Sequence, residues 1–132
     1  MIALDTNVLV RYLVQDIAHQ AEVAERLIDS LTFDNPGFVS REVAVELVRV
    51  LERAYGFGRN DIADVLGGLL AAAEIRLEAA LDIALAVERM RERGAGFADG
   101  MIWSASRNAG CRSLATFDRG MASLPGVDVL AE

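Results

Sequence analysis

The order of apolar segments along the chain predicts an α/β fold with a parallel sheet. Short apolar runs typical of buried strands alternate with longer segments in which apolar residues recur every three or four positions, as they do on one face of a helix. Strands that alternate with helices are typical of parallel sheets. The length of 132 residues suits one domain, and no repeat or linker interrupts it. We therefore expect a single domain over residues 1–132.

Each element follows from its own local pattern. Apolar runs bounded by turn residues predict strands over 2–4, 38–39, 74–77 (a strand or a bend), 112–115 and 127–130. Helical periodicity predicts helices over 6–13, 18–31, 41–55, 60–70, 78–93 and 98–109. Ser40 is a good N-cap for the third helix, which Gly56 closes, and Asn60 or Asp61 is expected to cap the fourth.

The composition excludes several chemistries. All 13 basic residues are Arg, so the chain has no Lys for a phosphate-binding P-loop or a Schiff base. One His and one Cys are too few for a zinc site, and one Cys forms no intrachain disulfide, as expected in a reducing compartment. No signal peptide and no apolar run of about 18 residues is present. We expect a cytoplasmic protein with no membrane partner.

Four acidic residues carry the most informative pattern: Asp5, Glu46, Asp99 and Asp118. Asp5 directly follows the first strand, Glu46 lies in the helix after the second, and Asp118 closely follows the fourth. Ligands of parallel sheets bind outside the carboxyl ends of the strands, so we expect these three at one edge. A carboxylate cluster without a neighbouring Lys or His favours a hard divalent cation such as Mg²⁺ or Mn²⁺.

Taken singly, each acid also has a structural interpretation. Asp5 and Asp99 precede or begin helices and can act as caps, and for Asp5 a capping role can coexist with metal binding. Asp118 can belong to an ordinary turn. Glu46 lies at the border of a helical stripe with Arg49, where Glu–Arg pairs contribute about 0.2–0.5 kcal/mol each.

The combination resembles a known family. The segments Leu4-Asp-Thr-Asn, Phe38-Val-Ser-Arg-Glu, Phe97-Ala-Asp-Gly and Leu114-Ala-Thr-Phe-Asp resemble, in order and spacing, the PIN-domain ribonucleases, and among them the VapC-type toxins of toxin–antitoxin pairs. The resemblance implies a three-layer α/β/α fold with a sheet of four to five strands. Gly100 departs from the family pattern, in which a helix former is more usual. The resemblance also implies a set of catalytic metal ligands, supported by two polar residues: Asp5, Glu46, Asp99 and Asp118, with Asn7 and Thr116.

The implied function is that of a toxin, a Mg²⁺- or Mn²⁺-dependent endoribonuclease neutralised by an antitoxin protein. Because the net charge of −7 repels RNA, we expect a local basic rim made of Arg11, Arg41, Arg49 and Arg53. Apolar residues of the second helix and of 62–70 suit a homodimer and an antitoxin groove, unless both stripes face the core. The alternatives are a catalytically weak PIN-like module that binds RNA or a partner, and a DNA-directed nuclease.

Overall fold

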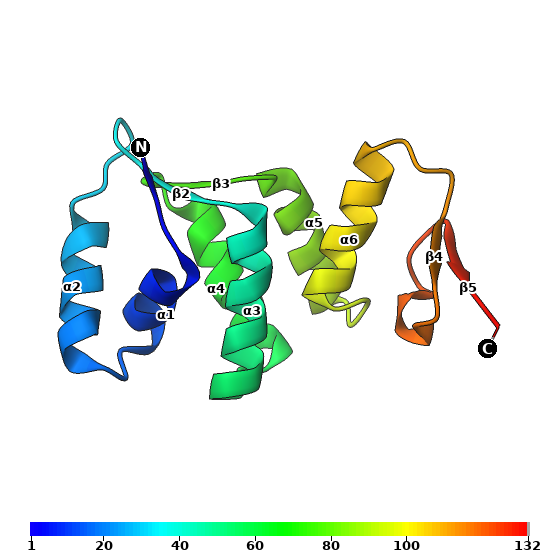
Figure 1. The fold of residues 1–132 in the computed structure, drawn as a ribbon, viewed down its shortest axis with the longest axis horizontal. Helices are drawn as coiled ribbons and strands as arrows, with labels where there is room; N and C mark the ends of the chain where they lie inside the picture. Colours follow the sequence, from blue (N-terminus) through cyan, green and yellow to red (C-terminus); the bar gives the residue numbers. More distant parts are fainter. Residues whose placement is uncertain (132) are drawn as a thin grey trace. The chain divides into compact units, whose positions relative to one another are not determined.

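The computed structural model describes residues 1–131, and these form two compact units that meet after Ala80. The first unit spans Met1–Ala80 and the second begins at Leu81. Figure 1 shows the elements of both, with the labels used below. In the part of the chain that the structure describes, no helix is both long and apolar enough to cross a membrane.

The first unit is built around a parallel three-stranded sheet. Its strands are β1 (Ile2–Ala3), β2 (Gly37–Val39) and β3 (Ile75–Leu77), in the order β1-β2-β3. Gly37 is aligned with Ile2 on one side and with Ile75 on the other. Gly37, Val39 and Ile75 are buried, whereas Phe38 is half-buried and Arg76 is exposed. In Figure 1 the strands cross the upper side of this unit and its helices lie beneath them.

Four helices cover this sheet: α1 (Thr6–Val14), α2 (Ala18–Asp29), α3 (Arg41–Tyr55) and α4 (Arg59–Ala71). Helix α1 packs against both α2 and α3. The Ala-rich stripe of α2 faces the core, because Ala21, Ala24 and Ile28 are buried. Ile62 and Leu66 of α4 are buried in the same way, and Leu69 and Leu70 are half-buried.

Caps explain where these helices begin and end. The Ser40 hydroxyl accepts a hydrogen bond from the Val43 N–H at 3.1 Å, and Gly56 ends α3 with a left-handed φ of 69°. The predicted N-cap of α4 was wrong: Gly58 is the N-cap, two residues before Asn60, and the helix begins at Arg59. Asp61 instead accepts a hydrogen bond from the Gly58 N–H at 3.0 Å, which satisfies one free donor of the first turn.

The second unit contains α5 (Ala80–Arg91), α6 (Phe97–Asn108), β4 (Leu114–Thr116), a 3₁₀ turn (Arg119–Met121) and β5 (Val127–Val129). The first residue of α5, Ala80, is the last residue of the first unit. Strands β4 and β5 form a parallel pair in which Leu114 is aligned with Val127. Helix α5 begins two residues later than predicted, because the Glu78 N–H continues the sheet by donating to the Val39 carbonyl at 2.8 Å.

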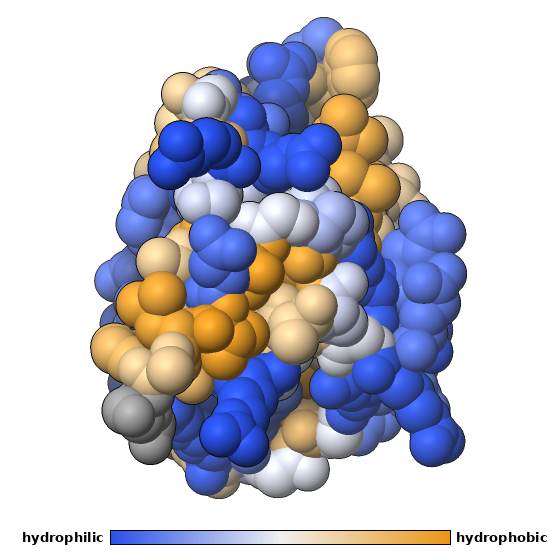
Figure 2. All heavy atoms as spheres, turned by 90° about the vertical axis from the view of Figure 1, so that its right-hand side faces the viewer, coloured by the Kyte–Doolittle hydropathy of each residue, from blue (hydrophilic) through white to orange (hydrophobic). Residues whose placement is uncertain are grey.

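Trp103 organises the packing of the second unit. It is buried with Ala95, Met121 and Leu124, and its indole N–H donates to the Pro125 carbonyl at 2.7 Å. The Arg89 guanidinium lies 4.5 Å from the centre of the Trp103 ring. Figure 2 faces the β4–β5 end and shows an apolar area among hydrophilic side chains; the exposed apolar residues of this unit include Phe117, Val129 and Leu130.

The packing around Gly100 explains why this position holds glycine instead of the usual helix former. It is buried in α6, and a Cβ added there would lie 3.2 Å from the Cβ of Ala86 in α5. The two helices therefore pack closely at this point, where Gly100 carries no side chain. The mixed α/β class with parallel strands is confirmed and is consistent with an α/β/α architecture, but the strands that the structure describes form two sheets, of three and two strands, instead of the expected single sheet of four to five.

Candidate metal centre

Asp5 stands where β1 ends and α1 begins. Its carboxylate accepts a hydrogen bond from the Thr6 N–H at 2.7 Å, so Asp5 is the N-cap of α1. Leu4, just before it, donates its N–H to the Phe38 carbonyl at 2.8 Å, which keeps the ends of β1 and β2 together. This pairing brings Asp5 to the edge of the sheet from which α3 starts. Capping occupies one carboxylate oxygen, and the exposed side chain has its other oxygen available to a ligand.

Glu46, from the second turn of α3, lines the same cavity as Asp5. The cavity measures about 220 Å³. Its other lining residues are Thr6, Asn7, Val10, Arg11, Val50, Ala54 and Tyr55. Glu46 is exposed, and its carboxylate forms no hydrogen bond or ion pair with any residue that the structure describes. The structure thus brings two of the four acids together and leaves Glu46 outside any Glu–Arg pair.

Thr6 is a polar member of this cavity that sequence reasoning missed. Its side chain is buried, and its Oγ1 has no hydrogen-bond partner among the described residues. A buried hydroxyl without a partner is costly, so such atoms call for a missing ligand or water. The signal was present in the sequence as the residue next to Asp5, but helical periodicity counts Thr6 only as the first residue of α1.

Asp99 and Asp118 belong to the second unit. Asp99 lies half-buried in the first turn of α6, and Asp118 follows β4. Burial raises the pKa of Asp99, and the negative charge of Asp118 raises this pKa further. Asp118 accepts a hydrogen bond from the Gly120 N–H at 2.8 Å, and the Thr116 hydroxyl accepts one from the Asp118 N–H at 3.0 Å. Thr116 therefore supports the turn that carries Asp118.

Comparison with models of protein families identifies the family of this chain. The model of the PIN domain matches residues 2–127, which is nearly the whole chain. The chain belongs to the PIN-domain family. PIN domains are generally nucleases, and commonly metal-dependent ones. No curated protein matches the chain.

The donors of this PIN domain fit a hard divalent cation. In the first unit, one cavity brings together the carboxylates of Asp5 and Glu46, the hydroxyl of Thr6 and the side chain of Asn7. Carboxylate, hydroxyl and amide oxygens are the ligands that Mg²⁺ and Mn²⁺ favour. Among the described residues, no group of three or more His, Cys, Asp or Glu side chains that could hold a metal ion is found.

Arg11 is a basic residue of the same cavity that several hydrogen bonds hold in place. It lines the cavity of Asp5, and its Nε donates to the Gln20 Oε1 at 2.7 Å. Its Nη1 donates to Asp16 and to the Tyr55 hydroxyl, both at 3.3 Å. Tyr55 in turn donates to Asp16 at 2.8 Å. This hydrogen bond, followed by the positive charge of Arg11, lowers the pKa of Asp16.

The other predicted basic residues lie on α3. The Arg41 backbone N–H donates to the Glu78 carboxylate at 2.9 Å, which fixes the start of the helix. Arg49 and Arg53 are exposed, and neither forms an ion pair within the described part of the chain. These two guanidinium groups are therefore accessible to an anionic ligand.

Proposed function

We propose that this PIN-domain protein is a metal-dependent endoribonuclease that hydrolyses RNA phosphodiester bonds. The observation that carries the proposal is the shared cavity of Asp5 and Glu46 in a chain that belongs to a nuclease family. The proposed ligands of Mg²⁺ or Mn²⁺ are Asp5 and Glu46, with Asp99 and Asp118 completing the set. The carboxylate of Glu46 supports this role because no other described residue satisfies it.

The residues around the cavity have separate proposed tasks. A bound divalent ion supplies activation of water and stabilisation of the leaving oxygen. Asp5 and Glu46 hold that ion, and the Thr6 hydroxyl donates a hydrogen bond to its ligands or to water. Arg11, held in place by Gln20 and Asp16, neutralises charge on the phosphate.

RNA cleavage tests this proposal directly. We expect the wild type to cut single-stranded RNA with Mg²⁺ or Mn²⁺ and to lose activity in EDTA. Asp5→Asn and Asp99→Asn should each lower the rate by at least about 100-fold, the upper end of what loss of a supporting group costs a metal site. DNA substrates of the same sequence test the alternative of a DNA-directed nuclease.

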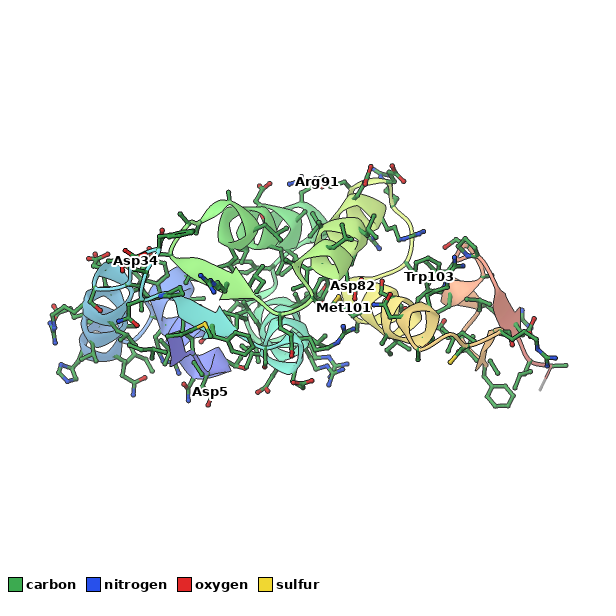
Figure 3. The ribbon with its side chains drawn as sticks, turned by 90° about the horizontal axis from the view of Figure 1, so that it is seen from above. Asp5, Asp34, Asp82, Arg91, Met101 and Trp103 are labelled. Atoms are coloured by element: carbon green, nitrogen blue, oxygen red, sulfur yellow. The ribbon has the colours of Figure 1, made fainter. Side chains whose placement is uncertain are left out.

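Asp34→Asn is the matched control, since it removes the same charge from an exposed residue. Asp34 precedes β2 and so lies at the sheet edge opposite to that of Asp5, and Figure 3 shows the two apart. Cleavage at the same rate by all four proteins would contradict the proposal. RNA binding without cleavage would instead favour a catalytically weak binding module.

We propose further that the enzyme is a VapC-type toxin held inactive by an antitoxin protein, and that it forms a homodimer. The resemblance supports the toxin role, and the exposed Ile17 and Val23 near α1 and α2 support a partner surface, since their side chains are 41% and 46% exposed. Induced expression should arrest growth, whereas Asp5→Asn should not. Co-expression of a small protein from the adjacent reading frame should restore growth, and sequencing of RNA 5′ ends should reveal the substrate.

A further inference from the structure

A second and larger cavity lies between α1 and α2, next to the candidate metal centre. It measures about 500 Å³, which is within the range of small-molecule sites. Its lining divides evenly into polar and apolar side chains: Asn7, Arg11, His19 and Gln20, with Val8, Val23, Ala24 and Leu27. His19 has no role in the proposed ribonuclease site, and Gln20 enters it only as the hydrogen-bond partner of Arg11.

The two cavities are joined through shared residues. Asn7 and Arg11 line the cavity between α1 and α2, and both also line the cavity of Asp5 and Glu46. They stand one helical turn apart on α1. A molecule seated between α1 and α2 therefore lies next to the cavity of Asp5 and Glu46.

The charge of the lining favours an RNA ligand. The chain carries a net charge of −7, yet none of the residues that line the cavity between α1 and α2 is acidic. The one residue with a permanent charge is Arg11. This surface is consequently one where an anionic ligand meets no direct repulsion from the lining.

The hydrogen bonds of Arg11 determine what Gln20 offers to a ligand. A guanidinium has only donors, so the atom of Gln20 that meets the Arg11 Nε at 2.7 Å must be the amide oxygen. The amide NH₂ of Gln20 has no partner among the described residues and remains a donor. Arg11 uses its Nε and Nη1, so its Nη2 also keeps its N–H groups for a ligand.

We propose that this cavity is a nucleobase subsite that selects a keto base, guanine or uracil, next to the scissile phosphate. The inference rests on the proposed ribonuclease function and adds Gln20 as a specificity-determining residue. On the edge that carries the O6 of guanine or the O4 of uracil, both bases present a carbonyl acceptor, and guanine adds a second acceptor at N7. Adenine and cytosine carry an amino donor in place of that carbonyl oxygen. Two sets of donors, on Gln20 and Arg11, match the keto bases and oppose the amino bases.

The remaining lining residues suit a flat base. Proteins bind single-stranded RNA by stacking its unstacked bases on apolar, His or Arg side chains and by forming hydrogen bonds to the edges of those bases. Val8, Val23 and Leu27 offer the apolar surface, and His19 offers an aromatic ring at the mouth of the cavity.

Binding of 5′-mononucleotides to the full chain tests the proposal without cleavage. Titrations of ¹⁵N-labelled protein with GMP, UMP, AMP and CMP in EDTA follow both affinity and location through the backbone amide signals. We expect GMP and UMP to bind at least about fivefold tighter than AMP and CMP, the lower end of what a good pair of base contacts discriminates. The amide shifts should fall in α1 and α2. Equal affinities, no binding, or shifts elsewhere would overturn the proposal.

Gln20→Glu isolates the role of the donor. A carboxylate still accepts from the Arg11 Nε, but it removes the NH₂ group, so the ratio of keto to amino affinities should fall to about one. Glu22→Gln is the control for charge on α2: Glu22 is exposed and outside the lining, its substitution changes the net charge by one unit of the opposite sign, and the ratio should not change. A ratio that survives Gln20→Glu would refute the assignment.

Cleavage of a randomised RNA by the wild type separates this inference from the proposed function. RNA that is cut with no preference for guanine or uracil beside the cleaved bond would overturn the subsite and leave the ribonuclease standing. Keto-selective binding in α1 and α2 together with no metal-dependent cleavage would overturn the ribonuclease and leave a nucleotide site.

Discussion

Glu46 and Leu47 are neighbours on α3 with opposite environments, and their substitution separates metal binding from stability. Glu46 is exposed without a partner among the described residues, whereas the Leu47 side chain is 0% exposed. Glu46→Gln removes one proposed metal ligand at nearly constant volume. Leu47→Ala leaves every proposed ligand unchanged and opens a cavity in the core of the first unit.

The metal-free stabilities follow from burial. Removing a fully buried Leu side chain costs about 2–5 kcal/mol, which is a large share of a typical total of about 5–15 kcal/mol. An exposed substitution usually changes stability by no more than about 0.5 kcal/mol. For Glu46→Gln the expected sign is stabilising, because one of two carboxylates in the same cavity loses its charge.

The gain in stability on adding metal should show the opposite contrast, with the smaller gain in Glu46→Gln. A ligand at 100 times its Kd stabilises the folded state by about 2.7 kcal/mol. If Glu46→Gln weakens affinity about tenfold, the same metal concentration yields only about 1.4 kcal/mol. Leu47→Ala should keep the full increment on a lower baseline. Urea unfolding with and without MnCl₂ measures all of these values. Equal metal increments in the wild type and Glu46→Gln would refute the assignment of Glu46.

Three further predictions concern charge and packing. Burial, and then the charge of Asp118, raise the pKa of Asp99, so the stability that protonated Asp99 contributes is full below the unfolded pKa of 3.8 and is lost as pH rises through the folded pKa. In ¹³C titrations of the metal-free protein, Asp118→Asn should lower the pKa of Asp99 only in part, because the effect of burial remains. An ordinary pKa of Asp99 in the wild type would contradict this prediction. Arg53→Gln should lower the salt slope of RNA binding by about 0.7, and an unchanged slope would exclude a phosphate contact. Gly37→Ala places a Cβ 2.9 Å from Cδ1 of Leu4 and should cost about 1–3 kcal/mol in urea unfolding, whereas an equally stable variant would show that the core yields there.

The helices with strong end signals could be predicted from the sequence alone. Helix α3 begins after Ser40 and ends before Gly56, as predicted, because a hydroxyl cap and a left-handed glycine act within a few residues of the chain. The start of α5 was missed because a contact distant in sequence decides it. Glu78 looks helical by pattern, but its N–H is held by the Val39 carbonyl of the neighbouring strand.

The same division between local and distant causes applies to the site. The joint placement of Asp5 and Glu46 could be predicted, because parallel neighbours β1 and β2 present their carboxyl ends at one edge. The buried hydroxyl of Thr6 and the contact of Tyr55 with Arg11 could not, since they depend on how α1 packs on α3. Periodicity identifies which face of a helix is apolar, but not which polar group that face covers.

The charges around the cavity of Asp5 and Glu46 suggest why metal and RNA binding should depend on each other. Two carboxylates and the Arg11 guanidinium leave this lining with one net negative charge, and Asp16 offsets part of the arginine charge. One divalent cation reverses the sign of this lining, counted by itself without the two carboxylates of the second unit. In a chain of net charge −7, that reversal changes local repulsion of a phosphate into attraction. The metal would then help to bind the substrate as well as activate water. The neighbouring cavity between α1 and α2, whose lining has no acidic residue, would receive the adjoining base.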